Sequence, residues 1–169
     1  MEKMGKLKRY CIMGAVFVTL AGTLSHFVYE WSGESFLLGF FFPVNESTWE
    51  HMKLYFFPML VCSLILNREL KTEYPCITSA LLGGILFGTF LIPILFYTYS
   101  GILGRNCFIL DFATFLASVT LGFIAVYRNT RSCKLAPYLN WLKVAVFVVA
   151  LCFFLFSYLP PAIGFFEKP

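Results

Sequence analysis

The sequence has few charged residues. Asp, Glu, Lys and Arg together make up 13% of its 169 positions, whereas hydrophobic residues make up 59% and aromatic residues 20%. A typical soluble domain is about 25% charged, so this composition excludes an ordinary soluble domain. We therefore expect a multi-pass integral protein of the cell membrane, with the lipid bilayer as its main partner and no nucleic-acid partner.

The sequence also lacks clustered cysteines. Its six cysteines occur singly, without the CxxC spacing or close grouping that a zinc site or a disulfide framework requires. We therefore interpret all six as packing residues. They are Cys11, Cys62, Cys76, Cys107, Cys133 and Cys152.

Five apolar stretches are long enough to cross a membrane, because a transmembrane helix needs about 20 residues. They are residues 10–30, 46–66, 75–100, 107–127 and 140–159. We predict an all-α bundle of five transmembrane helices that forms a single domain over residues 1–169. The stretch 36–43, interrupted by Gly39 and Pro43, is too short to span. It is predicted to be an interfacial or re-entrant segment between the first two helices.

Basic residues lie mostly on one side of the predicted bundle. That side carries Lys3, Lys6, Lys8, Arg9, Arg68, Lys71, Arg128, Arg131 and Lys134, and the other side carries Arg105 and Lys168. The cytoplasmic loops of membrane proteins carry the excess of Lys and Arg. The N-terminus is therefore predicted to be cytoplasmic and the C-terminus to lie outside.

The most polar stretch of the chain is Asn45–Lys53, which combines two glutamates, a histidine and a lysine. Asn45 or Ser47 can cap a helix that begins here. The Ser47-x-x-Glu50 spacing is typical of a capping box. These polar turns continue into the predicted second span.

Two further predicted helices carry polar residues on one face. These residues are Thr19, Thr23, His26 and Glu30 on the first helix, and Asp111, Thr114 and Ser118 on the fourth. Counting inward at 1.5 Å per residue places His26, Glu50, His51 and Asp111 about one turn inside the outer membrane edge. Ionisable groups at that depth face the bundle interior or a wet cavity. We therefore expect one outward-facing intramembrane site.

This site could bind a divalent metal ion, because imidazole and carboxylate groups suit zinc, manganese and iron. The candidate metal ligands are His26, His51, Glu50 and Asp111. The residues expected to bind a cation or small polar solute are Glu30, Asn45, Glu46, Trp49, Glu50, Lys53 and Asp111. The candidates for acid–base catalysis are Glu50, Glu46 and Asp111.

Each of these interpretations has a structural alternative. The histidines and carboxylates could form a hydrogen-bonded network that only holds the helices in register. Glu50 and Lys53 could be a simple i,i+3 ion pair, and Trp49 an interfacial anchor. Asp111 could form a salt bridge with Lys53 or Arg105.

The third predicted helix contains a patch of small residues. Gly83, Gly84 and Gly88 permit close packing between helices. Gly84 and Gly88 also offer a surface through which a homo-oligomer could form.

Two motifs resemble a known family. The run Leu24–Gly33 contains HF-x-YEWSG, and Phe42–Leu54 contains PVNES-x-WEH-x-K. Both are similar to an uncharacterised family of small multi-pass membrane proteins from Firmicutes-type bacteria, and the likeness covers most of the chain. The resemblance implies no activity, but it implies which residues form the signature. They are His26, Glu30, Asn45, Glu46, Trp49, Glu50, His51 and Lys53.

A second family fits less well. The membrane-embedded ceramidase-like hydrolases arrange His, Asp and Ser around zinc and use three histidines. This chain has two histidines, so a carboxylate would have to replace one ligand.

Three functions stay open at this point. The first is a site that binds a cation or small polar solute from the outer side, with transport as an extension. The second is a membrane-embedded, metal-dependent hydrolase. The third is a non-catalytic membrane partner or sensor whose polar network is structural.

Overall fold

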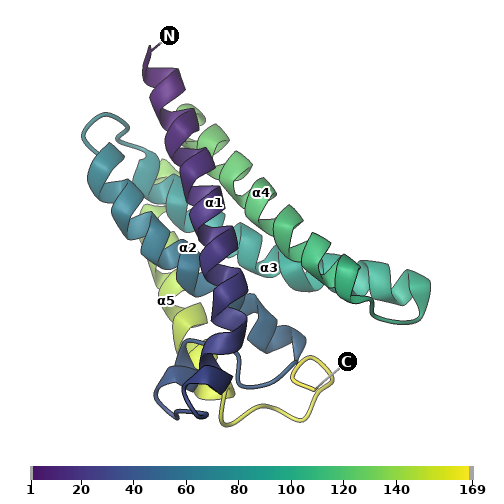
Figure 1. The fold of residues 1–169 in the computed structure, drawn as a ribbon. Coiled ribbons are helices and arrows are strands. Elements are labelled where there is room, and N and C mark those ends of the chain that lie inside the picture. Colours follow the sequence, from purple (N-terminus) through teal and green to yellow (C-terminus); the bar gives the residue numbers. More distant parts are fainter. Residues whose placement is uncertain (1, 168–169) are drawn as a thin grey trace.

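The computed structural model describes residues 2–167, with side chains from residue 5 onward, and this part of the chain is helical without strands. Figure 1 shows the helices packed side by side along much of their length. They are α1 (Glu2–Trp31), α2 (Thr48–Leu70), α3 (Ile77–Leu103), α4 (Phe108–Ser132) and α5 (Leu139–Phe156), with short 3-10 turns η1 (Leu38–Phe40) and η2 (Ala136–Tyr138).

Four segments are long and apolar enough to cross a membrane. They are Gly5–Trp31, Ile77–Leu103, Phe108–Ser132 and Ala136–Phe156. The prediction of an all-α multi-pass membrane protein is confirmed at this level. Helix α2 is not among the four, because its first turns carry Glu50, His51 and Lys53. A fifth span through α2 therefore stays a prediction.

Helices α2 and α3 form the centre of the packing. Helix α3 packs against α2, α4 and α5, and α1 lies across α2 and α4. The ring of Phe153 in α5 contacts Trp49 and Phe56 of α2, at centroid distances of 4.7 and 5.1 Å. This arrangement brings the end of α1 beside the start of α2, where the polar residues lie.

Tyr55 occupies a slot built from glycines of α3 and α4. Its side chain is fully buried, and its hydroxyl donates to the Gly84 carbonyl at 2.9 Å. A Cβ atom at Gly88 or Gly122 would lie 2.2 Å from the Tyr55 side chain. The glycine patch of α3 therefore serves close helix packing, as predicted. The prediction that Gly84 and Gly88 present a surface to a second copy is wrong, because both are buried inside the chain.

A disulfide joins Cys76 and Cys133, at the start of α3 and the end of α4. Their Cα atoms are 5.4 Å apart, although the residues are 57 positions apart in sequence. The interpretation of these two cysteines as packing residues is therefore wrong. Among the free cysteines, Cys11 and Cys62 are buried as packing residues.

The segment between α1 and α2 packs against the end of α5. The Tyr158 hydroxyl donates to the Phe36 carbonyl at 2.7 Å, and the Phe36 and Tyr158 rings are 4.5 Å apart. Phe36 and Leu37 remain exposed. An interfacial or re-entrant position for this segment stays a prediction.

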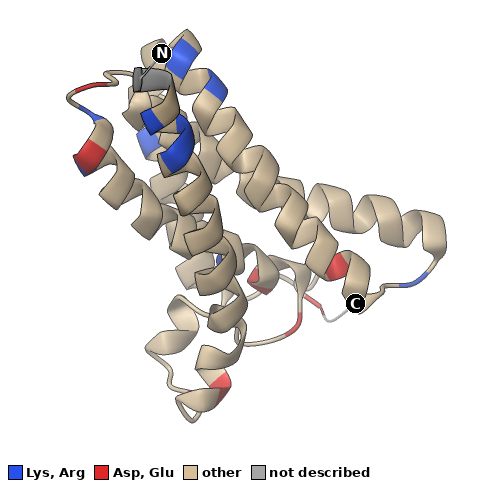
Figure 2. Cartoon of the chain, turned by 45° about the horizontal axis from the view of Figure 1, so that its top comes forward, with Lys and Arg blue, Asp and Glu red and all other residues tan. Residues whose placement is uncertain are grey.

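Charges are segregated along the molecule. Figure 2 shows most Lys and Arg residues at the end where α1 begins, and most acidic residues outside that cluster toward the other end. An ion pair of 2.6 Å joins Lys6 and Glu73 within the basic end. Lys168, which was assigned to the opposite side, lies outside the described residues. The direction of the bundle in the membrane stays a prediction.

Candidate metal-binding site

The turn that starts α2 positions the polar residues of the site. Ser47, one of the two predicted candidates, is the N-cap, and its hydroxyl accepts a hydrogen bond from the Glu50 amide at 3.3 Å. The Asn45 side-chain oxygen accepts from the Ser47 amide at 2.9 Å. The capping box is only half formed, because the Glu50 carboxylate accepts from Val44 N at 2.9 Å instead of from Ser47. These bonds fix Glu46 just before the helix and His51 in its first turn.

His26, Glu46 and His51 converge at this point. The Glu46 Oε2 atom lies 3.6 Å from His26 Nε2 and 3.4 Å from His51 Nε2. The three candidate ligand atoms all lie within 4.8 Å of one another. His26 comes from α1, whereas Glu46 and His51 flank the start of α2. The group therefore joins two helices at one end of the bundle.

The hydrogen bonding of His51 fixes which ring nitrogen is available. His51 Nδ1 lies 2.9 Å from the Ser47 carbonyl oxygen. Because a carbonyl oxygen only accepts hydrogen bonds, Nδ1 carries the hydrogen, and in the neutral ring the Nε2 lone pair then points toward Glu46. Metal-binding histidines commonly have such a backbone partner on the other ring nitrogen.

The two separations measured from Glu46 suit a tetrahedral metal ion. With metal–ligand bonds of about 2.0–2.1 Å, neighbouring ligands of a tetrahedral zinc site lie about 3.3–3.4 Å apart. The observed separations of 3.4 and 3.6 Å from Glu46 are close to this value. Two imidazoles and one carboxylate also form a donor set that zinc accepts.

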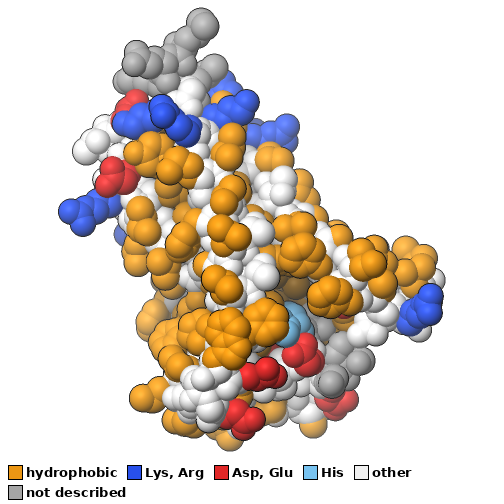
Figure 3. Space-filling model, in the orientation of Figure 1, with side chains coloured by type: hydrophobic (Ala, Val, Ile, Leu, Met, Phe, Trp, Pro, Cys, Tyr) orange, Lys and Arg blue, Asp and Glu red, His pale blue; other side chains and the backbone are white. Residues whose placement is uncertain are grey.

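The group is reachable from solution. The side chains of His26, His51 and Glu46 are 34%, 31% and 48% exposed. Figure 3 shows a histidine at the surface, with acidic side chains beside it and hydrophobic side chains above. A three-ligand site in this position leaves room for a fourth ligand from outside the protein.

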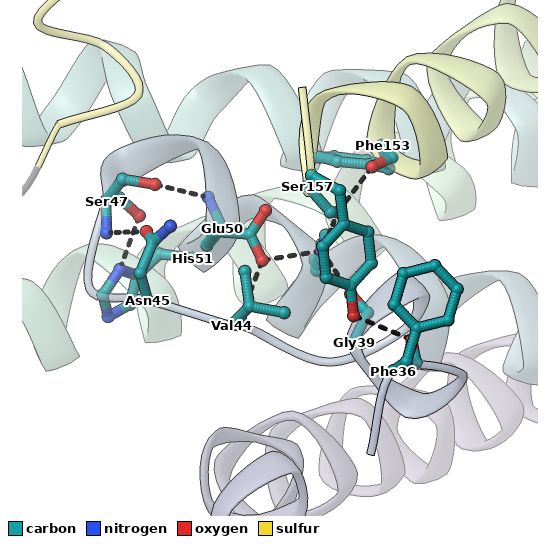
Figure 4. A network of polar contacts seen from close by, with 11 residues as sticks. Phe36, Gly39, Val44, Asn45, Ser47, Glu50, His51, Phe153 and Ser157 are labelled. Carbon is teal, nitrogen blue, oxygen red and sulfur yellow. Dashed lines mark hydrogen bonds and ion pairs between the residues drawn. The ribbon is translucent and has the colours of Figure 1, made fainter. Parts of the chain in front are cut away.

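Glu50 and Lys53 form a separate, buried cluster. Lys53 Nζ donates to Glu50 Oε2 at 2.6 Å, to the Gly39 carbonyl at 2.9 Å and to Ser157 Oγ at 2.5 Å. The Lys53 and Glu50 side chains are 0% and 2% exposed. Figure 4 shows Glu50 and Val44 lying between the Asn45–Ser47 turn and Ser157. These contacts tie α2 to η1 and to the end of α5.

Asp111 has a different partner from those expected. The Tyr99 hydroxyl donates to Asp111, and the same hydroxyl accepts from the Cys107 amide at 3.4 Å. The expected partners were Lys53 or Arg105, but Lys53 is held by Glu50. Asp111 therefore closes the connection between α3 and α4 and is not one of the three converging ligands.

Trp49 lies in an aromatic cluster and not at the metal-binding group. It is 8% exposed, and its ring contacts Phe153 and Phe166 at centroid distances of 4.7 and 5.1 Å. Its amide donates to the Phe165 carbonyl at 3.3 Å. The chain after α5 therefore folds back over the start of α2.

The remaining predicted residues lie around these clusters. Glu30 is exposed one turn beyond His26 on α1, and Asn45 is exposed in the capping turn. On the two polar stripes, Thr23 is exposed while Thr114 and Ser118 are buried. The stripes do not form one continuous buried lining.

The structure brings together two of the four predicted metal ligands, and metal binding by them stays a prediction. His26 and His51 come together, but with Glu46 instead of Glu50 or Asp111. The predicted second span begins at residue 46, which would make Glu46 helical. Because the helix begins only at Thr48, after the Ser47 cap, Glu46 has non-helical backbone and turns toward the histidines. The Ser47 cap signal was the clue to this boundary.

The fold and the polar clusters define a helical multi-pass membrane protein with a His/carboxylate group at one end of its bundle. The chain belongs to the family described as "Family of unknown function (DUF6512)", whose model matches residues 1–169. The resemblance to an uncharacterised family is confirmed at that level, and its bacterial group and signature stay predictions. No curated protein and no solved structure matches the chain.

Proposed function

We propose that this protein binds a divalent transition-metal ion through His26, Glu46 and His51. The observation that carries the proposal is that Glu46 Oε2 lies 3.6 and 3.4 Å from the Nε2 atoms of His26 and His51. A neutral His51 with its hydrogen on Nδ1 presents the Nε2 lone pair to the Glu46 oxygen, and two facing acceptors repel each other. Either protonation of the imidazole or a bound metal ion removes this repulsion, and the metal ion is the alternative that we propose.

Zinc matches the group best among the metals considered. Zinc favours four-coordinate sites with imidazole and carboxylate ligands, whereas manganese more often takes oxygen ligands. Iron sites with two histidines and one carboxylate have open positions on an octahedron, where neighbouring ligands lie about 3.0 Å apart for bonds of 2.1 Å. The longer separations here favour the tetrahedral ion.

The role of the site follows from its position. With α2 as a fifth span and the basic end of the bundle in the cytoplasm, the three ligands would lie at the outer side of the cell membrane. A half-exposed site there captures a cation, or a small polar solute held by the cation, from outside. Transport into the bundle would continue along the Thr114 and Ser118 face of α4.

A metal-dependent hydrolase is the second candidate. A site with three protein ligands and an open position is the arrangement of catalytic zinc, which activates a bound water. Glu46 is then a ligand, and Glu50 is held by Lys53. Asp111 is the one acid–base candidate left, and it would have to exchange its bond from Tyr99 for the metal-bound water.

Elemental analysis of detergent-purified protein tests the metal proposal. The wild type, incubated with zinc and then dialysed, should retain about one zinc per chain. His51→Ala and Glu46→Gln should lose it. Asp111→Asn should retain it, because Asp111 lies outside the ligand group.

Absence of bound metal would overturn the proposal. Folded wild-type protein that retains no zinc, manganese or iron means that the cluster is a protonated hydrogen-bond network. In that case the third interpretation, a membrane partner or sensor with a structural polar network, takes its place. Hydrolase assays against lipid and peptide substrates, with Asp111→Asn as the inactive variant, separate the enzyme from the binding protein.

A further inference from the structure

A groove at the basic end of α3 and α4 is lined partly by basic and partly by apolar side chains. It has a volume of about 690 Å³. Its lining includes the basic residues Arg128, Arg131 and Lys134 and the apolar residues Phe87, Leu121 and Ile124. The groove and the metal group lie at opposite ends of the molecule. Arg131 is in the last turn of α4, which lies near the start of α1, whereas His26 is near the end of α1. The groove therefore needs an explanation independent of the metal site.

The three cations of the groove are uncompensated. Among the described residues, the ion pairs are Lys6–Glu73, Lys53–Glu50 and the two histidine contacts of Glu46, so none involves Arg128, Arg131 or Lys134. The lining contains no acidic residue. The Arg131 guanidinium lies 5.5 Å from the centre of the Tyr127 ring, which holds it at the groove by a cation–π contact. The polar end is thus built to accept negative charge.

The apolar wall extends from these cations along the flank of the bundle. Leu121 lies seven residues before Arg128 on α4, or about 10 Å along the helix axis at 1.5 Å per residue. Phe87 of α3 and the α4 residues Leu121 and Ile124 are 47%, 42% and 42% exposed. Because α3 and α4 are both apolar enough to cross a membrane, these side chains lie where an acyl chain would run.

We propose that this groove binds a phospholipid with a negatively charged headgroup. The phosphate would contact Arg128, Arg131 and Lys134, and an acyl chain would lie along Phe87, Leu121 and Ile124. Basic pockets between transmembrane helices bind anionic headgroups in this way. Charge complementarity distinguishes this occupant from a zwitterionic lipid, which has no net charge for the three cations to attract.

The test is native mass spectrometry of delipidated protein titrated with phosphatidylglycerol or with phosphatidylcholine of the same chains. Wild type should bind phosphatidylglycerol more tightly. The triple variant Arg128→Gln/Arg131→Gln/Lys134→Gln should bind it about a hundredfold more weakly, since each basic residue near an anionic lipid contributes about fivefold. Arg68→Gln, an exposed arginine in the last turn of α2 and outside the groove, is the matched control and should bind like wild type.

Two further arms separate a lipid from a free anion and from a folding defect. Phe87→Ala should weaken phosphatidylglycerol binding severalfold while leaving any binding of inorganic phosphate unchanged. The melting temperature of each lipid-free variant, measured in detergent, should match wild type. Equal binding of the two lipids by wild type, or a triple variant that still prefers phosphatidylglycerol, would overturn the proposal. So would inorganic phosphate that displaces the lipid at equal concentration.

Discussion

Two polar clusters lie side by side at the start of α2, and they differ in how deeply their side chains are buried. In the first, Lys53 Nζ has three acceptors and is completely buried. In the second, His26, Glu46 and His51 are about one-third to one-half exposed, and the Glu46 Oε2 atom lies 3.6 and 3.4 Å from the two imidazole Nε2 atoms. Burial with every lysine hydrogen donated indicates a structural role. Exposure with three converging ligand atoms is what the proposed metal site requires.

The largest effect is expected at the buried cluster. Lys53→Met should lower the free energy of unfolding by about 3–5 kcal/mol, because it leaves Glu50 as an uncompensated buried charge. Thermal or denaturant unfolding in detergent measures this. Lys143→Met on α5, where the lysine is exposed, is the control and should change stability by less than about 0.5 kcal/mol.

A double variant of the buried cluster tests whether the loss of stability comes from the unpaired charge. Glu50→Gln/Lys53→Met should recover much of the lost stability, because it removes both charges together. Zinc binding by the folded double variant should stay within a few-fold of wild type. Loss of zinc in that variant would show that the two clusters act as one site.

A second destabilising change tests whether zinc binding merely follows stability. In protein purified without reductant, Cys76→Ser should cost about 2–4 kcal/mol by removing the disulfide, at the end of the molecule away from the metal group. Zinc should still bind with wild-type affinity at temperatures where the variant is folded. Cys152→Ser, which alters a partly buried free cysteine, is the control for the substitution itself.

Substitution in the metal group should affect zinc affinity strongly and stability only slightly. His51→Ala should weaken zinc binding by about 100-fold or more, since even changes to residues behind a ligand cost about 10–100-fold. Its stability without metal should fall by only about 1 kcal/mol, because the side chain is partly exposed. Zinc titration with a competing chelator gives the affinity. A variant that unfolds but binds zinc normally in its folded fraction would contradict the assignment.

The smallest effect is expected at Asp111. Asp111→Asn keeps an acceptor for the Tyr99 hydroxyl, so stability should change by about 1 kcal/mol or less. Zinc affinity should change by less than about threefold, because Asp111 is outside the ligand group. A 100-fold loss of zinc would place Asp111 in the site and favour the ligand set predicted from sequence.

The disulfide bears on the predicted orientation. Intracellular disulfides are rare and usually transient, and Cys76 and Cys133 lie at the basic end of the bundle. If this end faces the cytoplasm, as the charges predict, the two residues are thiols in growing cells and form the bond on oxidation. Thiol labelling of cells trapped in acid should then modify both. Complete protection would place this end outside.

The sequence predicted the fold class well but the site only in part. Apolar runs show where helices cross a membrane, and Ser47 marks the start of α2. Depth counting along straight helices placed Asp111 at the level of the histidines, but depth does not say which way a side chain points. Asp111 turns to Tyr99 within the α3–α4 connection.

Contacts between distant segments could not be predicted from periodicity. Neither the pairing of Cys76 with Cys133 nor the bond from Lys53 to Ser157 has a local signal, because each depends on how separate helix ends meet. The prediction of an oligomer surface at Gly84 and Gly88 was wrong for the same reason. A small-residue patch predicts close packing, but it does not say whether the partner is another helix of the same chain or a second copy.

The most direct test of the central claim is X-ray absorption spectroscopy at the zinc edge on the zinc-loaded wild-type protein. The account predicts two imidazole nitrogens and oxygen ligands at about 2.0–2.1 Å, with no sulfur, and loss of one imidazole in His26→Ala. Sulfur at about 2.3 Å, or a spectrum unchanged in His26→Ala, would contradict it.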